Sequence, residues 1–106
     1  MALRPLKYRN IKTAVDGVVF DSQKEARRYG ELRLMERAGQ IHDLALQPRF
    51  PIVINGVKVC TYVADFSYHD QQDRKFYEDV KGMLTPMYRL KKKLVKAVYG
   101  VEITEV

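Results

Sequence analysis

Residues 60–82 read CTYVADFSYHDQQDRKFYEDVKG, which is the pattern of two strands joined by a polar turn. The segment begins with β-branched and aromatic residues, becomes polar at 69–74, and then alternates again between polar and apolar types. This pattern places Asp65 inside the first strand and puts Asp79 and Lys81 at the end of the second. If the strands are antiparallel neighbours, we expect Asp65 and Asp79 to lie close together.

Two interpretations of these charged residues remain open. In the first, the carboxylates of Asp65 and Asp79 hold a hard divalent cation, because Mg²⁺ prefers carboxylate oxygens and keeps several water molecules. Lys81 would share their site, since alternate residues of a strand lie on the same face. In the second, the charges lie on a solvated sheet face and Asp65 pairs with Lys81.

The length and composition predict one small domain, and the net charge predicts a polyanionic partner. The chain has 106 residues, 46% of them hydrophobic, and a net charge of +6, which favours nucleic acid or an anionic membrane surface. No apolar run is long enough for a membrane span and no signal peptide is visible, so we expect a cytoplasmic protein. One cysteine and two histidines disfavour a disulfide or a zinc cage, and we interpret Cys60 and His42 as structural residues without a partner at ligand spacing.

The first 12 residues, MALRPLKYRNIK, are basic and lack apolar periodicity. We expect residues 1–12 to form an arm that becomes ordered on a partner, with Lys7, Arg9 and Lys12 contacting its phosphates. Residues 13–106 contain no repeat and no linker, and they are expected to form a single domain.

Two Asx–Gly pairs predict β-hairpins with primed turns. The pair at 16–17 predicts a hairpin over 13–20, and the pair at 55–56 joins a strand at 50–54 to a strand at 57–68.

The first helix is predicted from Ser22 to about Ala38, because Ser22 and Glu25 have capping-box spacing and Gly39 follows as a stop. Glu25 has two possible roles. Its carboxylate can reach back to the backbone N–H of Ser22, or it can top the helix face that packs on the sheet and point at the metal site. Arg28 is interpreted either as a solvated residue or as a DNA contact.

The second helix is predicted over 86–99, with Thr85 as its N-cap and Gly100 as its stop, followed by a strand at 101–105. The helix has no acidic residue, and its charge run is either a solvated face or a phosphate-binding surface. The basic residues assigned to DNA are Arg89, Lys91, Lys92, Lys93 and Lys96, and the expected buried stripe is Leu90, Leu94, Val95, Ala97 and Val98.

The order helix, three strands, helix, strand and the motifs FDSQKEARRY, LQPRF, YVADFSY, YEDVKG and TPMYRLKKKL resemble the PD-(D/E)XK nuclease superfamily. More closely, the chain is similar to small phage proteins of the DUF1064 family, related to Holliday junction resolvases. The resemblance covers most of residues 17–105 and implies an α/β (α+β) fold. That fold is a restriction-endonuclease-like αβββαβ core with a mixed central sheet flanked by helices, here preceded by an N-terminal β-hairpin. Ala64 stands where the superfamily motif has proline.

The resemblance also implies roles for individual residues. Asp65 and Asp79 match the two acidic metal ligands, Lys81 matches the lysine that orients the attacking water, and Glu25 matches a helical acid found in resolvase-like members. The backbone carbonyl of Val80 would be an additional ligand. Thr85, Tyr88 and Lys92 match a polar helix face beside the site, which adds Tyr88 to the expected DNA contacts.

The function implied is a Mg²⁺- or Mn²⁺-dependent DNA endonuclease, selective for branched DNA in phage recombination or replication, without a small-molecule cofactor and active in the host cytoplasm. A homodimer is expected because a resolvase cuts two symmetric strands, with the hairpin at 13–20 or an exposed sheet edge as the interface. Two alternatives remain open: a non-catalytic DNA-binding module of the same fold, and an RNA-directed nuclease or RNA binder.

Overall fold

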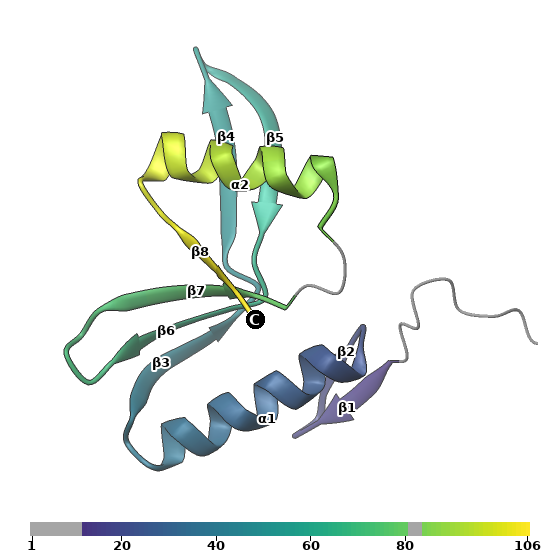
Figure 1. The fold of residues 1–106 in the computed structure, drawn as a ribbon, viewed down its shortest axis with the longest axis vertical. Helices are drawn as coiled ribbons and strands as arrows, with labels where there is room; N and C mark the ends of the chain where they lie inside the picture. Colours follow the sequence, from purple (N-terminus) through teal and green to yellow (C-terminus); the bar gives the residue numbers. More distant parts are fainter. Residues whose placement is uncertain (1–11, 81–83) are drawn as a thin grey trace, which may run out of the picture.

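The computed structural model describes residues 12–80 and 84–106, and the fold within them is mixed α+β. A central sheet lies between helices α1 and α2, and a small hairpin precedes α1 (Figure 1). This confirms the predicted fold class. The predictions for Lys7, Arg9 and Lys81 fall outside the described residues.

The described elements follow the predicted order. They are β1 (Thr13–Val15), β2 (Val18–Phe20), α1 (Gln23–Arg37), β3 (Ile41–Leu46), β4 (Arg49–Ile54), β5 (Val57–Val63), β6 (Phe66–Asp70), β7 (Lys75–Asp79), α2 (Pro86–Tyr99) and β8 (Ile103–Glu105).

Local turn chemistry sets both hairpins. Asp16 and Gly17 have φ values of 50° and 79°, and Asn55 and Gly56 have 52° and 76°. Two consecutive positive φ angles define the primed turn that matches the twist of the flanking strands. Both predicted hairpins are therefore confirmed.

Both helices begin and end where their capping residues predict. The side chain of Ser22 accepts a hydrogen bond from the backbone N–H of Glu25 at 3.1 Å, and Thr85 accepts one from Tyr88 at the same distance. Gly100 ends α2 with a φ of 70°, in the left-handed region that glycine adopts without steric cost.

The central sheet has the order β3-β6-β7-β8, with β7 and β8 parallel and the other pairs antiparallel. Beyond β3 and β6 the chain bends into the β4–β5 hairpin, which projects away from the sheet (Figure 1). The bend keeps the ladder intact, because Gln47 N–H donates to the carbonyl of Asp65 at 2.9 Å and Ala64 N–H to that of Pro48 at 3.0 Å. The predicted place of Asp65 inside a strand is wrong: it lies in the bend between β5 and β6.

Each face of the sheet has its own apolar core. Helix α1 covers one face, and its buried residues Tyr29 and Leu32 share a core cluster with Phe66 of β6. Helix α2 and the β4–β5 hairpin cover the other, around Ile52 and Val95.

The buried stripe predicted for α2 is only partly correct. Val95 is fully buried, whereas Leu90 and Val98 are 53% and 44% exposed. Helix α2 lies across the two-stranded β4–β5 hairpin (Figure 1). Because this hairpin is narrow, it covers only a narrow stripe of the helix surface.

The pairing of β3 with β6 places His42 opposite His69, with their rings stacked 5.3 Å apart. The expectation that His42 has no partner at ligand spacing is therefore wrong, because the partner comes from a strand distant in the sequence. Cys60 lies partly buried against the core beneath α2.

Neither helix in the described part of the chain has the length and apolar character needed to cross a membrane.

Candidate functional site

Asp65 is fastened to the end of β7. Its backbone N–H donates to the carbonyl of Glu78 at 3.0 Å, and its Oδ2 accepts a hydrogen bond from the backbone N–H of Val80 at 2.7 Å. The carboxylate thus closes the end of the β6–β7 pair. The two acids that the sequence placed on separate strands are brought to the same end of the sheet, since Asp79 is the last residue of β7.

Glu25 comes to the same place from the first turn of α1. Its carboxyl group is hydrogen-bonded to Asp65. Burial, followed by the charges of Asp65 and Asp21, raises the pKa of Glu25 from 4.5 to about 7, and Asp79 adds to the shift. The two roles considered for Glu25 are now resolved: its backbone N–H takes part in the helix cap, while its side chain faces the acids.

Asp21 is a site residue that the sequence analysis missed. With Glu25, Asp65 and Gln47 it lines a hollow of about 190 Å³, whose other walls are apolar residues of β2 and Leu46. The position of Asp21 directly before the N-cap Ser22, one turn ahead of Glu25, was the available signal. Gln47 offered none, because the bend that presents it depends on the β3–β6 pairing.

Asp79 is almost fully buried, at 1% exposure, on the side of the sheet that faces α2. Tyr88 lies beside it at 6% exposure, with Glu105 as a neighbour. Burial, the interaction with Glu105 and the nearby charge of Asp79 raise the pKa of Tyr88. The prediction that Tyr88 contacts DNA is corrected, because its ring is inside the protein beside the acids.

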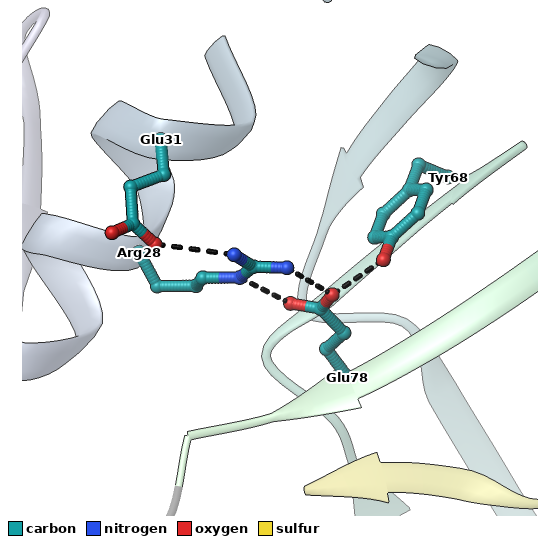
Figure 2. A network of polar contacts seen from close by, with 4 residues as sticks. All are labelled: Arg28, Glu31, Tyr68 and Glu78. Atoms are coloured by element: carbon teal, nitrogen blue, oxygen red, sulfur yellow. Dashed lines mark hydrogen bonds and ion pairs between the residues drawn. The ribbon is translucent and has the colours of Figure 1, made fainter. Parts of the chain in front are cut away.

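Glu78, the neighbour of Asp79, points to the opposite side and is held by α1 (Figure 2). Arg28 donates from Nε to Oε1 at 2.8 Å and from Nη2 to Oε2 at 2.6 Å, and the hydroxyl of Tyr68 donates to Oε2. Burial and this hydrogen bond raise the pKa of Tyr68 to about 12. Arg28 also contacts Glu31 at 3.1 Å.

This network corrects the interpretation of Arg28 as simply solvated, because carboxylates bind its guanidinium on two sides. The expected contact of Arg28 with DNA stays a prediction. The network fixes α1 against β7, and therefore fixes Glu25 relative to Asp79.

Glu25, Asp65 and Asp79 offer the oxygen donors that suit a hard divalent cation, but among the described residues it is His42, Asp43 and His69, and not these acids, whose ligand atoms all lie within 4.8 Å of one another. Carboxylate oxygens are the ligands that Mg²⁺ and Mn²⁺ prefer. Burial raises the pKa of Glu25 most and the charges of the neighbouring acids add to it, and a bound cation would offset both effects by favouring the deprotonated form. The Oδ2 contact of Asp65 leaves room for ligation, since a carboxylate has about four acceptor sites.

The basic residues of α2 do not form one uniform surface. Arg89, Lys92, Lys93 and Lys96 follow one side of the helix and line a groove of about 500 Å³ between α2 and β8. Lys91 does not line it. The acids that α2 lacks are supplied by β8 and the residue before it: Lys92 lies 3.3 Å from Glu105, and Lys96 lies 2.6 Å from Glu102.

A second group of cationic residues lies nearer the acids. Lys24 and Arg27 of α1, with Arg28, border a hollow of about 200 Å³ that also includes Val80. Arg27 and Lys12 are exposed. From this stretch Arg28 was predicted to contact DNA. Its neighbour Arg27 is the more exposed of the two and is better placed for a phosphate contact.

Comparison with known proteins identifies a family whose function is unknown. A family model described as a protein of unknown function, DUF1064, matches residues 5–104. No curated protein and no solved structure matches the chain significantly.

Proposed function

We propose that this chain, which belongs to the DUF1064 family of unknown function, is a Mg²⁺- or Mn²⁺-dependent DNA endonuclease. The observation that carries the proposal is the convergence of Glu25, Asp65 and Asp79 from a helix, a bend and a strand end. Packing acids together costs stability unless a cation is bound. Such a cluster is typical of a site that works with a metal.

Within the proposed site, Asp65 and Asp79 are the principal ligands, with Glu25 and the backbone carbonyl of Val80 completing the protein's share. Glu25 must release its proton to join them, because ligands bind in the deprotonated form. Asp65 also holds the Val80 peptide in place through its Oδ2 contact. A bound divalent ion would supply neutralisation of the phosphate charge and a water molecule of lowered pKa.

The resemblance to PD-(D/E)XK nucleases supports the same roles. In that pattern the second strand of the core carries an acid and the third carries an Asp-x-Lys motif, to which Asp65, Asp79 and Lys81 correspond, although Asp65 lies in the bend before β6. Lys81 would add positive charge beside the attacking water. Glu78, the residue of β7 directly before Asp79, is committed to Arg28 and is not a ligand.

The charge distribution favours a nucleic acid as substrate. Arg89 and Lys93 in the groove beside α2, and Lys24 and Arg27 of α1, would contact phosphates, because such contacts release condensed counterions. We further propose a preference for branched DNA. We also propose a homodimer, since symmetric cutting of a junction needs two sites.

A cleavage assay tests this function. Labelled four-way junction, matched linear duplex and RNA duplex would be incubated with the full chain in Mg²⁺, Mn²⁺ or EDTA, with Asp79→Ala as the control. We expect metal-dependent cutting of DNA that the variant loses, and faster cutting of the junction than of the duplex.

The same assay separates the alternatives. Cutting of RNA in preference to DNA would support the RNA-directed nuclease. Tight, salt-sensitive DNA binding by both proteins without cutting in either metal would contradict the nuclease and support the binding module.

A further inference from the structure

A second group of metal-binding side chains lies at the other end of the β3–β6 pair. His42 and His69 face each other across these strands, and Asp43 lies between them. Asp43 Oδ2 is 3.4 Å from His69 Nδ1 and 3.9 Å from His42 Nε2. Each of the three side chains has one possible ligand atom within 4.8 Å of a ligand atom of the other two.

The backbone brings Asp43 to the histidines. On a regular strand residue 43 would point away from the face that carries residue 42. The β3–β6 register shifts between His42 and Ala45, and Asp43 has a φ of 56°, in the left-handed region. A bulge of this kind re-aims a side chain, and here it turns the carboxylate toward both rings.

The spacing fits a tetrahedral ion. Zn²⁺ binds histidine nitrogens and carboxylate oxygens at about 2.0–2.1 Å, which sets two tetrahedral ligand atoms about 3.3 Å apart. The observed separations are close enough that small side-chain rotations would bring the three atoms onto one ion. Nitrogen ligands also distinguish this group from the all-oxygen acids near Glu25, since imidazole favours transition metals.

We propose that His42, Asp43 and His69 form a site for a divalent transition metal ion such as Zn²⁺, with water completing the coordination. His42 and Asp43 are exposed, so the ion has a direct path from solvent. Asp73 Oδ1 lies 3.0 Å from the same nitrogen, His42 Nε2, so this contact would give way when the nitrogen binds the ion, and Asp73 could then join as a further carboxylate ligand. Lys75 pairs with His69 across the strands. The ammonium of Lys75 lies over the ring of Tyr77, 5.6 Å from the centroid of that ring.

Zinc titration of the full chain by calorimetry tests the site. The Asp65→Asn/Asp79→Asn double variant serves as the background, so that heat from the acidic cluster is not mistaken for it. We expect one Zn²⁺ per chain, and about tenfold or greater weakening in His42→Gln and in His69→Gln. Asp16→Asn, which alters an exposed carboxylate in the first hairpin turn, should bind Zn²⁺ like the background.

Nuclear magnetic resonance of the ring nitrogens identifies the ligands. Zn²⁺ should shift His42 Nε2 and His69 Nδ1, and a thermal melt of each glutamine variant shows whether it is folded. Zinc affinity unchanged by both histidine substitutions in folded protein, or the absence of saturable zinc binding to the background, would overturn the proposal.

Discussion

At the scale of single residues, the most informative group is the carboxyl of Glu25. Burial and the neighbouring acids hold its pKa near 7, against 4.5 in an unfolded chain. Between about pH 4.5 and pH 7 the folded protein keeps a proton that the unfolded chain releases. This contribution to stability is present in full below pH 4.5 and is lost as the pH rises through 7.

We therefore expect the metal-free protein in EDTA to melt at a lower temperature at about pH 8 than at about pH 5.5. Glu25→Gln cannot titrate, and should lose much of this pH dependence. Saturating Mg²⁺ or Mn²⁺ should raise the melting temperature most at the higher pH, where Glu25 is already deprotonated. Equal pH dependence in the two proteins would show that Glu25 does not titrate as described.

At the scale of secondary-structure elements, the Arg28–Glu78 pair joins α1 to β7. Glu78 is 1% exposed, so removing its cationic partner leaves a buried charge uncompensated. Arg28→Met should lower the free energy of unfolding by about 3 kcal/mol. The neighbouring Arg27→Met, at an exposed position, should change it by less than about 0.5 kcal/mol.

Urea denaturation measures both effects. The double variant Arg28→Met/Glu78→Met should be more stable than the sum of the two single losses implies, because the pair is removed together. Strict additivity would mean that Arg28 and Glu78 are not coupled.

A second prediction at this scale concerns the side of α2 that lines the groove. Replacing Arg89 and Lys93 by glutamine should weaken DNA binding and reduce the salt slope by about one for each phosphate that the variant no longer neutralises. Lys91→Gln, outside the groove, is the matched control. Fluorescence anisotropy over a salt series, with Asp79→Asn present in every protein to prevent cutting, gives the comparison. A larger effect from Lys91→Gln would place DNA elsewhere.

At the scale of the whole molecule, the proposed symmetric cutting of a junction would require two copies of the chain. Sedimentation velocity at micromolar protein should show a dimer, alone or on a four-way junction. Of the surfaces predicted for it, the β1–β2 hairpin leaves Val19 at 64% exposure, although its other face packs on α1 through Phe20. A monomer under both conditions would contradict the dimer.

The sequence predicted what local chemistry determines. The Asx–Gly turns, the caps at Ser22 and Thr85 and the stop at Gly100 each act over a few residues, and the structure has them where predicted. The break at Asp65 was not predicted, because the matching break at Gln47 and Pro48, between β3 and β4, comes to lie opposite it only when the strands pair.

Long-range pairs also escaped prediction. Arg28 and Glu78 are 50 residues apart, and the contact of His42 with His69 depends on strand register. In the candidate site, Asp65, Asp79 and Glu25 were predicted, while Asp21 and the burial of Tyr88 required the folded chain.

The most direct test of the central claim is the cleavage rate of single carboxamide variants in saturating Mn²⁺. Glu25→Gln, Asp65→Asn and Asp79→Asn would be compared with the unmodified chain and with Asp16→Asn, which alters an acid outside the cluster. If the acids form one catalytic metal centre, each of the three should cut roughly 100- to 1,000-fold more slowly, while Asp16→Asn cuts normally. Cutting by folded Asp79→Asn at the rate of the unmodified chain would contradict the proposed site.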